Sequence, residues 1–286
     1  MNIKKEIFLM SNTFQPIQDV KWNSIIKNDI KWDYALLGEG EDTIIFFPGG
    51  MRRQVYGEGF IKELIHEFRV LIPLYPRISM LSPMVEGIVN IMNQESISDA
   101  HLYGSSFGGL MAQAFMYYEP KKVKNVVISN TGTINKDQTY EKKIKRFLFL
   151  IRLVPAFIVR KIMFKSFSNL IPAEIENREQ ILQYLRSVIW SKTLDKQDIL
   201  CHFENLIDFQ INIKITPENT TQLQKRMLII TAENDPGVSP TASQSLKEIY
   251  PNAQFYHFME GGHIPLLVKP KIYLNLVKNH FTKDFQ

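Results

Sequence analysis

The length and composition of the chain limit the kind of protein it encodes. With 286 residues, 45% of them hydrophobic, the chain can bury about three quarters of its unfolded surface, and an α/β architecture of this size is routinely a single domain. The net charge is +5, but the sequence contains no motif that reads a nucleic-acid groove, so we expect no nucleic-acid partner. The one cysteine, Cys201, excludes an internal disulfide and suits a reducing compartment.

The N-terminal segment predicts a cytoplasmic protein. Its first eleven residues contain two lysines but only four consecutive apolar residues, whereas the apolar region of a secretory signal needs about 7 to 15. The longest apolar tract, residues 147–164, is interrupted by three basic residues and a proline. That is too many charges for a membrane span, which needs about 20 mainly apolar residues.

Strand-like and helix-like segments alternate through the first half of the chain. The expected strands are residues 31–37, 43–47, 69–73, 100–103 and 123–129. The expected helices are residues 59–67 and 83–93, and a helix that includes residues 110–115. Such alternation is typical of a mostly parallel sheet with helices on both faces.

The alternation stops in the middle of the chain and then resumes. Residues 135–224 contain helix-like segments and no convincing strand, and the strand pattern returns at residues 227–231 and 254–259, on either side of a helix at 240–250. We therefore divide the chain into an N-terminal part of the core (1–134), a helical insertion (135–224) and a C-terminal part of the core (225–286).

The strongest motif is Gly104-Ser105-Ser106-Phe107-Gly108, a G-x-S-x-G pentapeptide between the strand at 100–103 and the following helix. A strand, a sharp turn and a helix are the setting of a nucleophile elbow, which lifts a serine hydroxyl above the sheet. The alternative is an ordinary glycine-rich turn. The rest of the chain favours the elbow, with Ser106 as the nucleophile.

An acidic residue and a histidine follow Ser106 in the order that such a catalytic triad requires. Asp235 lies in the polar turn after the strand at 227–231, and His263 lies in the loop after the strand at 254–259. Each follows its own strand, which favours a catalytic acid and base over solvated loop residues. Glu233 is a less suitable acid, because it could take this role only if the turn were rearranged.

An oxyanion hole is predicted upstream of the elbow. The strand at 43–47 leads into Pro48-Gly49-Gly50-Met51, where Gly50, or failing it Met51, would supply one backbone N–H and Phe107 the other. The alternative for this loop is a plain Pro-Gly turn.

These motifs resemble the α/β-hydrolase superfamily from about residue 31 to 281, and within it the maspardin-like group. The segments that carry the second likeness are residues 104–113, 154–162, 250–253 and 261–262. The resemblance implies that the insertion is a cap over the active site. Members of that group do not all keep a complete triad, and some are better described as adaptors. Pro48 stands where the superfamily often has a histidine, a change that leaves the backbone N–H groups in place.

The first part of the insertion is basic and amphipathic. The segment from Lys136 to Lys165 contains nine basic and two acidic residues. Its apolar residues recur with helical spacing and form one face, which includes Phe147 and Ile151. We expect Phe147, Ile151 and Phe157 to contact substrate. The basic face is either simply solvated or contacts an anionic membrane surface or acyl carrier.

The sequence therefore predicts a serine hydrolase that cleaves a carboxylic ester or related acyl substrate and needs no metal or organic cofactor. Esterase, thioesterase and carbon–carbon bond hydrolase remain open, as does the oligomeric state. The alternative is a non-catalytic binding protein that uses the insertion as an interaction surface. Three further residues of the insertion are not expected to act in catalysis. We expect Glu204 and Asp208 to be solvated charges and His202 to be structural.

Overall fold

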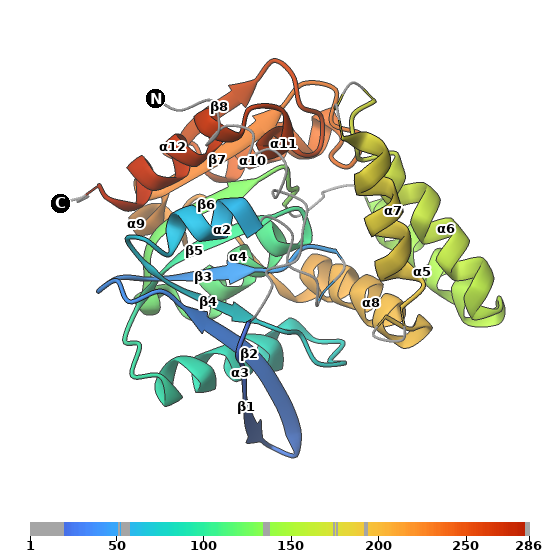
Figure 1. Cartoon of the computed structure of the whole chain (residues 1–286), viewed down its shortest axis with the longest axis horizontal. Helices are drawn as coiled ribbons and strands as arrows, with labels where there is room; N and C mark the ends of the chain where they lie inside the picture. Colours follow the sequence, from blue (N-terminus) through green and yellow to red (C-terminus); the bar gives the residue numbers. More distant parts are fainter. Residues whose placement is uncertain are drawn as a thin grey trace.

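The computed structural model describes residues 20–50, 52, 58–133, 138–173, 175, 177–191 and 194–283, and it forms one sheet of eight strands with helices around it (Figure 1). The strands are β1 Trp22–Lys27, β2 Ile30–Leu37, β3 Thr43–Phe47, β4 Arg69–Pro73, β5 Ala100–Ser105, β6 Val123–Ser129, β7 Met227–Ala232 and β8 Gln254–Phe258. The helices of the core are α2 Glu58–Leu64, α3 Leu81–Gln94, α4 Phe107–Tyr118, η1 Pro120–Lys122, α10 Pro240–Ile249, α11 Pro265–Val268 and α12 Pro270–Phe281.

The sheet is mostly parallel, as predicted. Its strand order is β1-β2-β4-β3-β5-β6-β7-β8, and only the pairs β1–β2 and β2–β4 are antiparallel. From β4 to β8 all neighbouring strands therefore end at the same edge. The loops that follow β3, β5, β6, β7 and β8 meet there, which is where open α/β sheets place their ligand sites.

Strand β1 was not predicted from the sequence. It pairs with β2 through a turn at Asn28 and Asp29, both with positive φ (52° and 60°), which is the backbone of a two-residue hairpin. Trp22 and Ile26 of β1 are exposed. An edge strand with exposed apolar residues lacks the alternation of apolar and polar residues that reveals a half-buried strand in the sequence.

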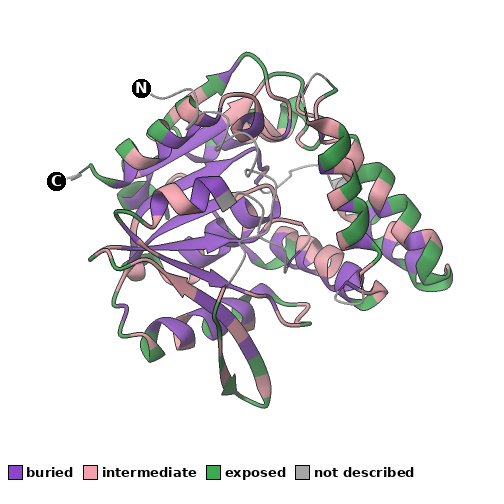
Figure 2. Ribbon diagram, in the orientation of Figure 1, coloured by how far each residue is buried: buried purple, intermediate pink, exposed green. Residues whose placement is uncertain are grey.

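Helices cover both faces of the sheet, and alternate residues of β3 pack against the two helix layers. Ile44 and Phe46 pack with residues of α2 and α12, whereas Ile45 and Phe47 pack with residues of α3, α4 and α10. Figure 2 shows the central strands β3, β4, β5 and β6 almost entirely buried between these layers, whereas the edge strands β1 and β8 are partly exposed. The sheet faces are thus filled by apolar side chains at alternate positions.

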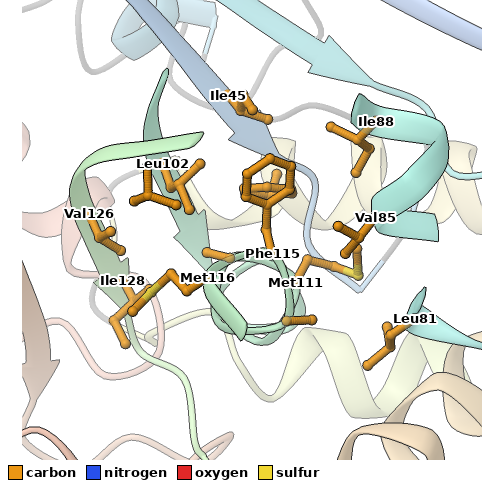
Figure 3. Packing of buried hydrophobic residues seen from close by; sticks show 14 of the residues in the cluster. Ile45, Leu81, Val85, Ile88, Leu102, Met111, Phe115, Met116, Val126 and Ile128 are labelled. Atoms are coloured by element: carbon orange, nitrogen blue, oxygen red, sulfur yellow. The ribbon is translucent and has the colours of Figure 1, made fainter. Parts of the chain in front are cut away.

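Helix α4 lies at the centre of the larger layer (Figure 3). Its residues Met111, Phe115 and Met116 are almost completely buried and project into a cluster with Leu102 of β5 and Ile128 of β6. Fully burying such side chains contributes about 1.5–3 kcal/mol each. This packing fixes the first residue of α4, and with it the turn that precedes the helix.

The insertion between β6 and β7 is helical in its described residues, as predicted. Its helices are α5 Gln138–Leu153, α6 Ala156–Ser168, α7 Arg178–Ile189, α8 Lys196–Asn212 and the short α9 Thr221–Gln224. The helices share a hydrophobic cluster of their own, which includes Ile151, Val159 and Leu185. In Figure 1, α5, α6 and α7 form a separate layer beside the sheet. The limits at residues 134 and 225 stay a prediction.

Helix α8 joins the insertion to the core through polar contacts that range from exposed to buried, which we call the polar seam. Asp198 and Asp195 bind Arg77, Asn205 Nδ2 donates to the Ile78 carbonyl (3.1 Å), and Asp208 Oδ2 accepts from the Leu81 N–H (2.8 Å). The seam also takes in Glu204, which binds Ser79 and Arg152.

The expectation that Glu204 and Asp208 are solvated was therefore wrong. Asp208 is 9% exposed and caps the first turn of α3. Their spacing of one helical turn was visible in the sequence, but the core groups that they bind, Ser79 and Leu81, are more than a hundred residues away. Within the described ranges, no helix is both long and apolar enough to cross a membrane.

Candidate active site

Ser106 lies in a strained turn between β5 and α4, as the elbow motif predicts. Its backbone has φ 55° and ψ −123°, a combination that non-glycine residues adopt only when the surroundings hold them there. A Cβ on Gly104 would lie 2.1 Å from the Gly108 oxygen, and one on Gly108 would lie 2.2 Å from the Phe47 oxygen. Both elbow glycines are thus required by close backbone packing.

Two hydrogen bonds to the end of β6 hold the elbow in place. The Ser106 N–H donates to the Ser129 carbonyl (2.9 Å), and the Thr131 hydroxyl donates to the Ser106 carbonyl (2.8 Å). The turn is therefore fastened at both of its backbone polar groups. The segment after β6 is the structural link between the serine and the neighbouring loops.

Asp235 and His263 are brought together by the loops after β7 and β8. His263 Nδ1 lies 2.8 Å from Asp235 Oδ1, and the two side chains are only 6% and 7% exposed. The Gly237 N–H also donates to Asp235 Oδ1 (2.7 Å). Gly237 packs against the imidazole so closely that a Cβ there would lie 2.5 Å from His263 Nδ1. The ring is held in one orientation by these contacts.

The pKa of Asp235 lies below its usual value although the residue is buried. Burial alone raises the pKa, but the hydrogen bonds and charge of His263, and the N–H donors of Asn130 and Gly237, outweigh that effect. The carboxylate is therefore ionised at neutral pH, and it can stabilise a positive charge on the imidazole.

Asn130 is a site residue that the sequence analysis missed. Its Nδ2 donates to Asp235 Oδ2 (3.0 Å) and to the Gly262 carbonyl (3.0 Å), and its Oδ1 accepts from the Ser129 hydroxyl (2.8 Å). Asn130 thus connects the loops after β6, β7 and β8. It directly follows β6, so the rule that located Asp235 at a strand end would have located it as well.

Ser106 is connected to the Asp235–His263 pair only through other residues in the described part of the chain. Ser106 is linked to the segment Ser129–Thr131, and Asn130 of that segment binds Asp235. In the part of the chain that the structure describes, the Ser106 hydroxyl makes no hydrogen bond to the imidazole. Serine–histidine hydrogen bonds are often long in unliganded enzymes and shorten when substrate binds.

Glu233 points to a different histidine. Its carboxylate lies 3.0 Å from His257 Nε2, and His257 Nδ1 lies 2.9 Å from the Thr231 hydroxyl. Glu233 is also exposed. It belongs to a surface group on β7 and β8, apart from the Asp235–His263 pair.

The loop after β3 lies beside the elbow, where the predicted oxyanion hole requires it. Gly50 follows β3, and Phe107 is the first residue of α4, whose N–H has no partner within the helix. Tyr75 steadies both sides, since its hydroxyl donates to the Pro48 carbonyl (3.1 Å) and its ring packs on Phe107. Met51 lies outside the described residues.

Two side chains of the insertion reach this loop. A Cβ on Gly50 would lie 3.0 Å from the ring of Phe167 in α6 and 3.6 Å from the ring of His202 in α8. The His202 ring also packs on Phe107, with centroids 4.5 Å apart. Neither residue was singled out as a substrate contact from the sequence, because its proximity to Gly50 arises only when the insertion docks.

His202 is neutral in the folded protein. Burial, followed by the nearby Arg52 guanidinium, lowers its pKa to about 3. Its Nδ1 is buried, and among the described residues it has no hydrogen-bond partner. Arg52 is itself buried and donates to Asn205 Oδ1 (2.5 Å) and to the Pro76 carbonyl (2.8 Å).

The three predicted substrate contacts take different positions in the insertion. Ile151 is 2% exposed within the insertion's own cluster, and Phe147 packs at the edge of that cluster on Phe203, with ring centroids 4.8 Å apart. Phe157 is 56% exposed at the surface. The side chains that lie over the oxyanion loop are Phe167 and His202 instead.

Known proteins resemble this chain in sequence and in fold. Maspardin from Homo sapiens is 23% identical over 229 residues, which cover 76% of this chain and 68% of maspardin. Maspardin from Danio rerio is 22% identical over 210 residues, which cover 71% of this chain and 61% of that protein. These matches confirm the resemblance to maspardin.

Solved structures share the fold at low sequence identity. A hydrolase from Pseudomonas aeruginosa superimposes with a TM-score of 0.71 at 13% identity, covering 92% of this chain and 99% of that one. An esterase from a Rhodococcus species gives a TM-score of 0.70 at 14% identity, with 93% and 99% covered. Residues 79–270 match the family model described as alpha/beta hydrolase fold. This match spans the elbow, the insertion, Asp235 and His263, and the chain belongs to the alpha/beta hydrolase fold family.

Proposed function

We propose that the protein is a serine hydrolase that cleaves a carboxylic ester or related acyl substrate through an acyl-enzyme on Ser106. The observation that carries this proposal is the buried hydrogen bond between His263 and Asp235, on the same sheet edge as a serine in elbow geometry. The pair is buried, the pKa of Asp235 is lowered and Gly237 packs closely against the imidazole, which supports a role as catalytic acid and base.

The acylation step assigns a role to each residue of the proposed triad. The Ser106 oxygen attacks the acyl carbonyl while His263 takes the hydroxyl proton. Asp235, hydrogen-bonded to His263 Nδ1, keeps the proton of that nitrogen in place and stabilises the imidazolium. His263 then gives its proton to the leaving alcohol, and the acyl group stays on Ser106.

Deacylation repeats these roles with water. His263 takes a proton from a water molecule, whose oxygen attacks the acyl carbonyl. The bond between the acyl group and Ser106 then breaks, His263 returns the proton to the Ser106 oxygen, and the free acid leaves. In both steps the N–H groups of Phe107 and Gly50 would bind the negative oxygen, each worth about 2.7–4 kcal/mol in a comparable enzyme. Phe107 is suited to this role because it begins α4, whose dipole favours negative charge.

The contacts over the oxyanion loop support an acyl group with apolar character. Phe167 presents a ring edge close to Gly50, and His202 is a neutral ring with one unbonded buried nitrogen in the described part of the structure. Such a wall accepts hydrocarbon and offers one polar group to an ester or thioester oxygen. We therefore propose Phe167 and His202 as substrate contacts, and the contacts expected at Phe147, Ile151 and Phe157 stay a prediction.

Labelling with a fluorophosphonate probe tests the proposed nucleophile directly. The wild-type protein should be labelled and Ser106→Ala should not. Ser105→Ala is the matched control, because it removes the neighbouring hydroxyl in the same pentapeptide and should label normally. Absence of labelling in the folded wild-type protein would favour the alternative, a binding protein that keeps the fold without catalysis.

A further inference from the structure

Exposed apolar side chains gather at the corner between α5 and α6. Phe149 is 61% exposed, Leu150 50%, Leu153 68% and Phe157 56%. We call these four residues the apolar tip. They form the densest group among the exposed large apolar residues in the described part of the chain, and the insertion places them on its outer side, where Figure 2 shows exposed helix surface.

The apolar tip lies outside the hydrophobic cluster of the insertion. On α5, the opposite face carries Ile144, Leu148 and Ile151, and on α6 it carries Val159 and Met163, all buried in the insertion's cluster. The helices therefore already have a complete apolar face, and the tip is surplus to it. Large apolar side chains in such a position commonly mark an interaction surface.

Basic residues surround the apolar tip along the same helix surfaces. Lys142 and Arg146 precede Phe149 and Leu153 at helical spacing on the exposed side of α5. On α6, Lys161 and Lys165 follow Phe157 in the same way, with the Lys161 ammonium 5.7 Å from the Phe157 ring centre. The surface is thus an apolar centre with a basic rim.

The charge of this surface differs from that of the remaining protein. Residues 138–168 contain eight basic residues and one acidic residue, Glu141, so their net charge is +7 in a chain of net charge +5. The other residues together carry −2. A long-range attraction to an anionic surface would therefore orient the molecule with α5 and α6 foremost.

We propose that the apolar tip and its basic rim dock the protein on an anionic lipid bilayer. Basic side chains near such a bilayer are drawn to its headgroups, and aromatic and aliphatic side chains enter the boundary between headgroups and acyl chains. An acidic protein partner would satisfy the rim but would also need an apolar groove for the tip. A bilayer satisfies both with no specific shape.

The docked orientation bears on the proposed active site without depending on it. Phe157 and Phe167 lie ten residues apart on α6, which is about 15 Å along the helix axis. Docking through Phe157 would hold the residue that covers Gly50 within that distance of the lipid surface. Acyl substrates of the bilayer would then lie close to the insertion.

Vesicle co-sedimentation with the full chain tests the proposal, with binding as the readout instead of catalysis. The protein should sediment with vesicles of phosphatidylcholine mixed with phosphatidylserine. It should bind phosphatidylcholine alone far more weakly, and high salt should weaken the binding to mixed vesicles. No binding to the mixed vesicles at low salt would overturn the proposal and leave an acidic protein as the partner to examine.

Surface variants separate docking from general electrostatic attraction. Lys142→Gln with Arg146→Gln should weaken binding about thirtyfold, because each basic residue near the surface contributes roughly fivefold. Leu153→Ser with Phe157→Ser keeps the charge and should weaken binding at least about tenfold. Lys27→Gln with Lys121→Gln, exposed on the core, is the charge-matched control. Equal loss in the control and in the tip variants would contradict docking through α5 and α6.

Discussion

The edge of the sheet and the helical insertion are built on different principles. At the sheet edge, Ser106, Asn130, Asp235 and His263 each follow one of four adjacent parallel strands, and backbone or buried hydrogen bonds fix them. The insertion has its own hydrophobic cluster and meets the core through the polar seam and through Phe209 of α8, which packs in the core cluster. Under the proposed function, this difference assigns the chemistry to the sheet edge and the selection of substrate to the insertion.

The largest effect should come from the nucleophile at the sheet edge. Ser106→Ala should lower kcat for a short p-nitrophenyl ester by about 10⁶-fold, because the triad acts as a unit. The thermal midpoint should stay within a few degrees, since the elbow is held by its backbone and its glycines. Unchanged turnover in this variant would remove the chemistry from the sheet edge.

Replacing the acid should have the next largest effect. Asp235→Asn should lower kcat by about 10⁴-fold, because an amide cannot keep His263 in the required tautomer and charge state. Glu233→Gln is the matched control two residues away, and it should change kcat little, as Glu233 binds His257 instead. The reverse ranking in steady-state kinetics would assign the acid to Glu233.

Asn130→Ala tests whether the sheet edge depends on the link between its loops. The substitution removes the donor to Asp235 Oδ2 and to the Gly262 carbonyl, and kcat should fall about ten- to hundredfold, since a hydrogen bond to a charged group contributes about 1.5–3 kcal/mol. KM should change little if the role is positioning. A loss confined to KM would instead indicate direct contact with substrate.

Substitutions in the insertion should change substrate preference and leave the chemical step intact. Phe167→Ala should extend the acyl chain that is accepted, with kcat/KM rising about three- to fourfold per added methylene beyond the wild-type optimum. Phe157→Ala is the control, because its ring is exposed away from Gly50. A series of esters from acetyl to decanoyl measures both. An optimum that moves with Phe157 alone would restore the contact expected from the sequence.

The smallest expected effect is a loss of folding stability in acid. It allows the core and the insertion to be compared directly, because each contains a buried histidine. Burial lowers the pKa of His101 in the core to about 4 and that of His202 in the insertion to about 3, against about 6.5 in an unfolded chain. Between these values the unfolded state binds more protons, so stability should fall as the pH drops below about 6.5. Each group contributes at most about 1.4 kcal/mol per pH unit.

Thermal melts at pH 7 and pH 5 measure this effect. His101→Gln should reduce the difference between the two midpoints, because the group that takes up the proton on unfolding is gone. His202→Gln should reduce it equally if the insertion unfolds together with the sheet. A reduction in His101→Gln alone would show that the insertion unfolds as a separate unit.

The sequence predicted the parts of the molecule that depend on local order along the chain. The parallel sheet, the helical insertion and the elbow followed from periodicity and from the G-x-S-x-G motif, and the Asp235–His263 contact agrees with the expected positions after two strands. These features need only the rule that neighbouring parallel strands end together. Whether the three residues act as a triad stays a prediction.

The parts that escaped prediction depend on contacts between distant segments. Asp208 looked solvated because its partner, the N–H of Leu81, is 127 residues away, and the rings of Phe167 and His202 lie near Gly50 only once α6 and α8 have docked. Strand β1 escaped because an exposed edge strand lacks alternation. Asn130 is different, since its place directly after β6 is visible in the sequence, but an asparagine carries no acid–base chemistry that would mark it as a site residue.

The packing of the elbow has a consequence for how this chain can change over evolutionary time. Gly104 and Gly108 leave no room for a side chain, whereas the Ser106 backbone is held through its own N–H and carbonyl, so the turn does not require a serine hydroxyl. A single substitution at position 106 would thus remove the proposed nucleophile and leave the backbone contacts of the elbow in place. Under the proposed function, a catalytic and a non-catalytic form of this fold would be separated by one residue, and both would stay folded.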